Sequence, residues 1–212
     1  MLRMMKYQSS VPSVGRAWRR ERGFTLHEIL IVVTIIAMMV AVGYPLLWRS
    51  QVRARLISEV RMLEQATMVA RVNAVKHGRR VAMKILDDNA QQQGGDVFAW
   101  VDDNEDGLQT AGEDEVGRWT VQQRFFIGPD GANPFFKLAS SDDARGIVFL
   151  PNGTTIANAA GAIGVGQGAV EVMDEHLNTI RIMVRGGSGT VTTEMWNPFD
   201  DSWSDEIRFW RY

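Results

Sequence analysis

An unbroken apolar segment near the N-terminus constrains this chain more than any other feature. The segment runs from Phe24 to Trp48, and Thr34 is the only polar residue in its core, Ile29 to Val42. As an α-helix, about 25 residues reach roughly 37 Å, which is enough to cross the hydrocarbon core of a bilayer. A buried helix in a soluble core is the alternative, but so long a run beside a basic cluster is typical of a membrane segment. We therefore predict a single membrane-spanning helix.

The charges are divided between a basic head and an acidic body. Residues 1–23 hold six basic groups and one acidic group, a net charge of +5, whereas the remaining residues hold 17 basic and 24 acidic groups, a net charge of −7. A basic flank before a membrane helix keeps the N-terminus in the cytoplasm, so we expect the acidic body on the far side of the inner membrane. Because an acidic body repels phosphate, nucleic acid is not an expected partner.

The helical pattern continues beyond the apolar segment. Pro45 is expected to kink or locally melt the helix, and Gly78 to end it. Between them, apolar or small residues recur at spacings of three and four, which is one face of a helix. These residues are Val52, Leu56, Val60, Leu63, Thr67, Ala70 and Ala74. An amphipathic half of this kind is expected to pack on a domain in water.

Beyond Gly78 the pattern is that of short strands separated by turn residues, among them Gly94-Gly95 and Pro151-Asn152-Gly153. We predict strands near Arg80–Leu86, Val97–Val101, Gly117–Val121, Phe125–Ile127, Gly146–Leu150, Ala169–Met173, Thr179–Val184 and Val191–Trp196. The expected fold class is α+β, with a long N-terminal α-helix, transmembrane and then amphipathic, packed on antiparallel β-sheet.

The stretch Gly23-Phe24-Thr25-Leu26-His27-Glu28 opens the apolar segment and is the most specific motif in the chain. A carboxylate at the beginning of a membrane helix is costly unless it is paired. A cut after Gly23 leaves a free α-amino group on Phe24, and Glu28 then lies one turn along the same helix. Glu28 is expected to neutralise that amine or the amine of a neighbouring subunit, and to complement the positive end of the helix dipole.

With Pro45, this stretch resembles the class III signal of type IV pilins and type II secretion pseudopilins. The resemblance implies a pilin-like fold, cleavage by a prepilin peptidase between Gly23 and Phe24, and methylation of the new N-terminal phenylalanine. It implies an assembly role for Glu28 and Pro45, with other pilin or pseudopilin subunits as partners. His27 departs from the apolar residue usual at its position.

Residues 70–79, 98–102 and 147–153 resemble, more weakly, the GspH/FimT group of minor pilins. This group primes or caps pilus-like filaments, so the resemblance implies a minor subunit whose head lies in the periplasm and, after assembly, at a filament tip. The expected organisation is a basic leader (1–23), a transmembrane and filament-core helix (24–48), its amphipathic continuation (49–78) and a β-rich head (79–212).

A signal peptide for general export is the alternative for the N-terminus, with Ala41-Val42-Gly43 as its cleavage site. Pro45 just beyond that cut and Glu28 at the start of the apolar segment argue against it. The two interpretations differ in the mature N-terminus, which is Phe24 for a pilin and Tyr44 for a signal peptide.

An acidic stretch fits the pattern of a calcium-binding loop, D-x-[DN]-x-[DN]-G-x5-E, with Gly107 at the turn. The predicted ligands are Asp102, Asn104, Asp106 and Glu113. The stretch follows a strand-like segment instead of a helix, and Gln109 replaces the usual apolar anchor. A solvated turn is therefore the alternative, and Ca²⁺ is the one cofactor considered.

The chain shows no catalytic constellation, so we do not expect an enzyme. It contains no cysteine, which excludes thiolate metal sites and cysteine nucleophiles. His27, His77 and His176 have no partners spaced for a triad or a zinc site. The glycine-rich residues 161–168 precede no clear helix, so they are expected to be a loop without a phosphate site.

The alternatives to a filament subunit are a DNA- or surface-binding adhesin on the same scaffold, or a membrane-anchored exported domain without a filament role. Some proteins of this type bind DNA through a GRxR segment, whose nearest counterpart, Gly189-Thr190-Val191-Thr192, lacks both arginines; Arg181 and Arg185 lie upstream. The C-terminal aromatic residues are expected in the core, with a docking surface as the alternative. They are Trp196, Phe199, Trp203, Phe209, Trp210 and Tyr212.

Overall fold

The computed structural model describes residues 24–86, 91–129, 136–138, 145–156, 168–208 and 210. Within them the chain forms one long helix, α1 (Leu26–His77), followed by antiparallel strands. The chain divides into two compact units, which meet between Pro45 and Leu46. The α+β class predicted from the sequence is confirmed by these elements.

Helix α1 runs through Pro45 without interruption, so the local melting considered from the sequence is absent. The missing N–H of a proline removes only one bond of the helical ladder, and the flanking turns maintain the helix. The helix ends where expected, with Lys76 and His77 in its last turn and Gly78 at φ +63°. Basic groups in the last turn complement the negative end of the helix dipole, and glycine adopts the left-handed conformation without steric cost.

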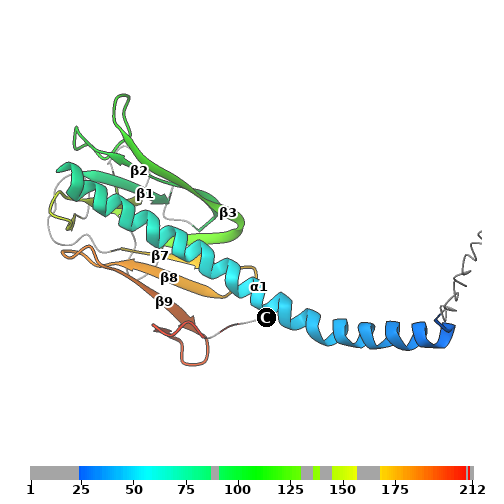
Figure 1. Ribbon diagram of the computed structural model, residues 1–212. Helices are drawn as coiled ribbons and strands as arrows, with labels where there is room; N and C mark the ends of the chain where they lie inside the picture. The colour runs from blue at the N-terminus through cyan, green and yellow to red at the C-terminus, as the bar shows by residue number, and fades with distance from the viewer. Residues whose placement is uncertain are drawn as a thin grey trace, which may run out of the picture. The chain divides into compact units, whose positions relative to one another are not determined.

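The described strands form a single antiparallel sheet (Figure 1). Along the main path their order is β10-β9-β8-β7-β3-β2-β1-β5-β4, and β6 pairs with β5. The strands are β1 (Val81–Leu86), β2 (Gln92–Val101), β3 (Glu115–Pro129), β4 (Phe136–Lys137), β5 (Arg145–Phe149), β6 (Thr155–Ile156), β7 (Gly168–Met173), β8 (Thr179–Val184), β9 (Val191–Asn197) and β10 (Ser202–Ser204).

Two strands predicted from the sequence, near 117–121 and 125–127, are parts of the single strand β3. The polar pair Gln122 and Gln123 resembles a break but continues the strand. Gly94-Gly95 was predicted as a connection and instead lies inside β2, where both glycines have positive φ and the register with β3 shifts. A bulge of this kind bends a strand without ending it. Strand β3 thereby pairs with β2 and also with β7, joining the two halves of the sheet.

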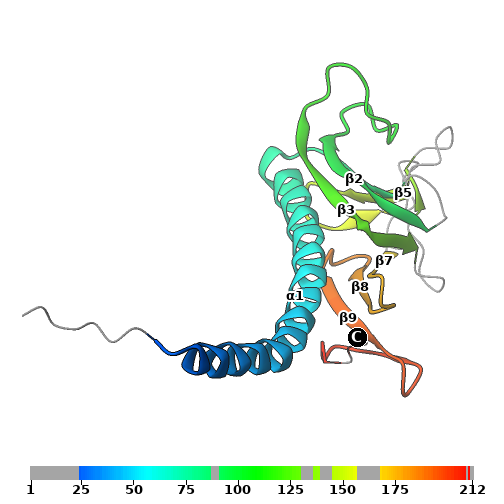
Figure 2. The same ribbon diagram turned by 90° about the vertical axis from the view of Figure 1, so that its right-hand side faces the viewer.

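The main core lies between the sheet and the part of α1 beyond Leu46 (Figure 2). All seven residues predicted for the buried helix face are buried. Alanines at 66, 70 and 74 present little side chain, so the helix backbone approaches the sheet closely. Alternate residues of the strands complete this core, for example Met83 in β1 and Phe149 in β5. A second, smaller cluster on intervening positions contains Trp100 and Val148.

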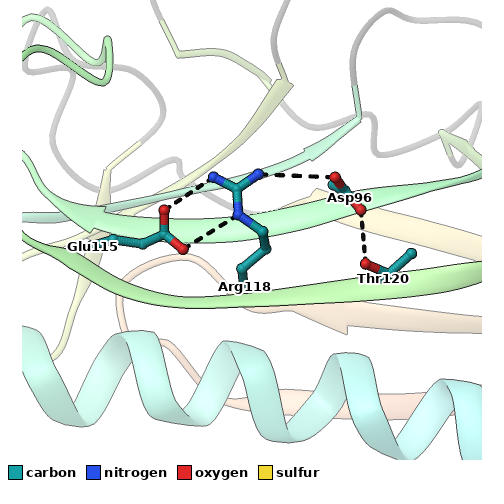
Figure 3. A network of polar contacts seen from close by, with 4 residues as sticks. All are labelled: Asp96, Glu115, Arg118 and Thr120. Carbon is teal, nitrogen blue, oxygen red and sulfur yellow. Dashed lines mark hydrogen bonds and ion pairs between the residues drawn. The ribbon is translucent and has the colours of Figure 1, made fainter.

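A polar network joins neighbouring strands on β2 and β3 (Figure 3). The guanidinium of Arg118 donates to Glu115 Oε2 at 2.9 Å and lies 3.8 Å from Asp96 Oδ2. Thr120 Oγ1 donates to Asp96 Oδ1 at 2.8 Å, and Arg118 also lies over the ring of Phe98. All four polar side chains are exposed to water, so the network contributes little to the free energy of folding. Its main effect is to fix the register of β2 against β3.

The far end of α1 is tied to two turns of the head through Arg71. Its Nε donates to Gly153 O at 3.0 Å, and its Nη2 donates to Ser188 O at 2.8 Å. Gly153 belongs to the turn predicted between β5 and β6, and Ser188 to the turn between β8 and β9. The two turns touch, because a Cβ on Gly189 would lie 2.5 Å from Gly153 O.

The C-terminal aromatic residues differ in burial, and the docking surface considered from the sequence stays a prediction. Trp210 packs against the main core beneath Arg53, whereas Phe199 is 86% exposed. Trp196 and Trp203 form an edge-on pair across β9 and β10, with ring centroids 5.3 Å apart. Phe209 and Tyr212 lie outside the described residues.

Gly146 in β5 is required by the close approach of β1. A Cβ at this position would lie 1.8 Å from Met83 O. We expect Gly146→Ala to destabilise the full-length chain in detergent by about 2–4 kcal/mol, because the two strands must separate to accept the methyl group. Thermal unfolding measures this loss. Gly128→Ala in β3 is the matched control, since the atoms nearest to its Cβ belong to Gln91, with Cγ at 3.5 Å, an ordinary van der Waals distance. Equal melting temperatures for the two variants would contradict the close approach.

Glu59 lies on the buried face of α1 with 6% of its surface exposed. Burial raises the pKa of Glu59, while a hydrogen bond from the Gln122 main-chain N–H and the charge of Arg124 oppose the shift. A raised pKa in the folded state means that ionisation of this carboxyl penalises folding. The penalty is absent below the ordinary glutamate pKa and appears as the pH rises through the folded-state pKa.

We therefore expect Glu59→Gln to raise the melting temperature of the full-length chain at pH 7 and to leave it nearly unchanged at pH 4. The glutamine amide oxygen still accepts the hydrogen bond from Gln122. Melting curves at both pH values test this, with Glu64→Gln on the same helix as a control for the loss of one charge. If Glu59→Gln changes the melting temperature by the same amount at both pH values, the raised pKa of Glu59 is refuted.

Candidate functional site

The N-terminal end of α1 carries the predicted processing and assembly residues. Phe24 precedes the helix and is 82% exposed. Thr25 and Glu28 cap the helix reciprocally: Glu28 N donates to Thr25 Oγ1 at 3.3 Å, and Thr25 N donates to Glu28 Oε2 at 2.9 Å. Gly23 lies outside the described residues, so the cleavage between Gly23 and Phe24 stays a prediction.

The reciprocal cap is a feature that the sequence interpretation of Glu28 missed. Its signal was present, because Thr-x-x-Glu before an apolar run is a capping box. Thr25 Oγ1 also donates to Glu28 Oε2, at 2.9 Å, so both bonds to the carboxylate reach the same oxygen. Among the described residues, Glu28 Oε1 accepts no hydrogen bond. Glu28 therefore completes the start of the helix and keeps one oxygen for a further donor.

The first half of α1 exposes a continuous apolar surface. Its most apolar window has a mean hydropathy of 2.5, and none of that window is buried. Thr34, its one interior polar residue, donates its hydroxyl to Leu30 O at 2.8 Å within the helix. Apart from the helix start and the bond that Pro45 removes, a regular helical ladder satisfies the backbone inside the segment, which is the condition for a helix in lipid. Length and composition suffice to cross a membrane; an export signal passes the same test.

The acidic stretch forms the loop between β2 and β3, and we call residues 102–113 the acidic loop. Two main-chain hydrogen bonds hold its base: Val101 N donates to Asp114 O at 2.9 Å, and Asp102 N donates to Arg80 O at 3.0 Å. Its backbone turns sharply, with left-handed conformations at Glu105 (φ 62°) and Gly107 (φ 73°). The strand context expected from the sequence is therefore observed.

The predicted ligand residues organise the acidic loop through their own oxygens. Asp102 Oδ1 accepts from Gly107 N at 3.3 Å, and Asn104 Oδ1 accepts from Asp106 N at 3.1 Å. Glu113 accepts from Asp103 N at 3.1 Å and from Thr110 N at 2.8 Å. In the described part of the chain, acidic and histidine side chains do not converge in groups of three at metal-binding distance. Calcium binding by Asp102, Asn104, Asp106 and Glu113 stays a prediction.

Two further candidate groups, His176 and Arg181, have structural roles. The ring of His176 contacts Trp48 edge-on at 5.2 Å. Arg181, considered for DNA, is largely buried: its Nε donates to Glu194 Oε2 at 2.8 Å, and its guanidinium lies over the ring of Trp203. An arginine held by a carboxylate and an indole is not presented to a phosphate backbone.

Residues 18–44 match the family model described as the prokaryotic N-terminal methylation motif. The matched segment contains Gly23, Phe24 and Glu28, which confirms the resemblance of this segment to the signal of type IV pilins and pseudopilins. Among solved structures, the chain is similar to the minor pseudopilin EpsH from the Type 2 Secretion System of Vibrio cholerae. The similarity covers 65% of this chain and 93% of that chain, with 12% sequence identity and a TM-score of 0.41. No curated protein matches the chain at a significant level.

Proposed function

We propose that this chain is a minor pilin or pseudopilin, a structural subunit that primes or caps a type IV pilus or a type II secretion pseudopilus. The observation that carries the proposal is the methylation motif on residues 18–44, which coincides with an apolar, exposed and capped helix start. Its role is assembly, not catalysis. Before assembly the chain is anchored in the inner membrane by one span, with its head in the periplasm.

The proposed first step is cleavage between Gly23 and Phe24 by a prepilin peptidase, followed by methylation of the Phe24 amine. The exposure of Phe24, the residue that would follow the cut, supports this step. The helix cap does not depend on the leader, since Thr25 and Glu28 supply it. Removal of the leader therefore leaves the start of α1 intact.

In the proposed second step the first half of α1 leaves the lipid for a bundle of similar helices. Lipid and protein are equally apolar surroundings for this surface, so the transfer changes the free energy little. It also does not select how one helix is aligned with the next. A charge pair between Glu28 and an N-terminal amine then fixes the register of one helix against the next. Glu28 Oε1, which accepts no hydrogen bond among the described residues, is available to that amine. Pro45 lies in the same segment and is assigned to assembly with it.

We expect the mature protein to begin at Phe24 and to carry one methyl group on its amine. Mass spectrometry of the N-terminal peptide measures this after expression of the full chain with and without a prepilin peptidase. Gly23→Val should abolish processing, because a branched side chain replaces a small, flexible residue at the cut. Ala41→Leu is the matched control, since it alters only the alternative cleavage site. A mature N-terminus at Tyr44 would instead establish a signal peptide and overturn the proposal.

A second prediction concerns the charge of Glu28. Glu28→Gln keeps an oxygen to cap Thr25 but cannot form an ion pair, so we expect cleavage to continue and incorporation into sheared filaments to fall about tenfold or more. Quantitative mass spectrometry of the filament and membrane fractions measures the ratio. His27→Gln, the adjacent residue, is the control and should assemble normally. Normal incorporation of Glu28→Gln would show that the carboxylate has no assembly role.

A further inference from the structure

A buried carboxylate oxygen in the acidic loop has no hydrogen-bond partner. Asp102 is 1% exposed, and its Oδ2 is both inaccessible and unpartnered in the part of the chain that the structure describes. Its other oxygen, Oδ1, accepts from the main-chain N–H of Gly107, at the centre of the loop. Oδ2 belongs to the same carboxylate and is therefore held next to the oxygen that already binds the centre of the loop. Burial removes the water around an anionic oxygen, which costs free energy when no hydrogen bond replaces that water. A bound cation offsets this cost.

The surroundings of Asp102 are negatively charged. Burial is the largest cause of a raised pKa at Asp102, and the Gly107 N–H opposes it. The charges of Glu113 and Asp106 raise the pKa further, and Arg80 lowers it by a smaller amount. The interior of the loop therefore contains an excess of carboxylate charge near one buried oxygen, which is favourable for a divalent cation.

The backbone of the acidic loop already places oxygens at alternate positions. Asn104 Oδ1 and Asp106 Oδ1 each accept from the main chain two residues further on, at 3.1 Å and 2.7 Å. These bonds orient the two side chains along the same turn of the loop. They do not themselves identify a ligand, but they limit how far the side chains must move to meet Asp102.

We propose that the acidic loop binds one Ca²⁺, with oxygens from Asp102, Asn104, Asp106 and Glu113 as side-chain ligands and the main-chain carbonyl of Leu108 as a further ligand. Calcium accepts six to eight oxygens in flexible geometry, whereas magnesium requires a tighter octahedron and retains its waters. Four side chains and a carbonyl from one loop can supply the larger number of oxygens that calcium accepts, which favours calcium over magnesium.

Binding requires the loop to tighten around Asp102. Glu113 spends both carboxylate oxygens on the main-chain N–H groups of Asp103 and Thr110, so it must turn inward to reach the ion. Because the loop begins at the end of β2 and ends before β3, a bound ion fixes the connection between these two strands. The main-chain bond from Asp102 to Arg80 extends the effect to the residue before β1.

The test uses the full-length chain in detergent, freed of divalent ions by a chelator, with CaCl₂ as the probe. We expect calorimetry to show one site with a dissociation constant of about 0.1–1 mM, the range of extracellular calcium modules. At 10 mM Ca²⁺ the melting temperature of the head should rise by about 3–8 °C, from the linkage between binding and folding. Mg²⁺ at the same concentration should give a much smaller rise.

Variants separate a specific site from general screening of acidic charge. Glu113→Gln should weaken calcium binding at least tenfold, and Asp114→Asn, which removes the same charge from the exposed neighbouring residue, should bind normally. Asp106→Ala, which removes the side-chain oxygens at that position, serves as a second ligand variant if Glu113→Gln unfolds. The proposal is overturned if Ca²⁺ produces neither heat nor a melting shift at 10 mM, if Mg²⁺ acts equally, or if the ligand and control variants respond alike.

Discussion

The whole structure depends on one helix that serves two different surroundings. The first half of α1 exposes apolar side chains on every face, which water does not tolerate over so large an area. The second half buries one face against the sheet and exposes a mixture of charged and apolar side chains elsewhere. No change of secondary structure separates the halves, because the helical ladder satisfies the backbone in lipid and in water alike. What changes at about Pro45 is the pattern of side chains alone.

Several buried polar groups of the head hold turns. Asp174 accepts from the main-chain N–H groups of His176 and Asn178, both at 2.9 Å. Asn197 accepts from Phe199 N at 3.0 Å. Burial of these side chains is offset by the hydrogen bonds that they accept. Asp102 also holds a turn, but one of its oxygens is left over, and this difference is what distinguishes the acidic loop as a candidate binding site.

Periodicity predicted most of the fold because burial imposes it. The helix face from Val52 to Ala74 and the strand Thr179–Val184 follow directly from spacings of three to four and of two. Glu59 was expected on the polar faces of the helix because of its charge, and this was wrong. It lies on the buried face, three residues after Leu56 and four before Leu63. Gly146 gave no signal, since the approach of Met83 arises only when distant strands pair.

The features of the candidate sites that are local in the sequence could be predicted, and those that depend on the folded sheet could not. The acidic loop and the start of α1 are local, so their residues appear together in the sequence, and the Thr25–Glu28 cap was readable from its spacing. The unpartnered oxygen of Asp102 was not readable, because it depends on how deeply the loop base is covered. Long-range contacts such as that of Arg181 with Glu194 and Trp203 likewise require the assembled sheet.

The two hydrogen bonds of Arg71 determine how a force along α1 reaches the head. Its guanidinium holds Gly153 and Ser188, which belong to connections on separate hairpins, at the end of α1 remote from the apolar half. A force along the helix is therefore transmitted through Arg71 to two turns, and not to a single strand.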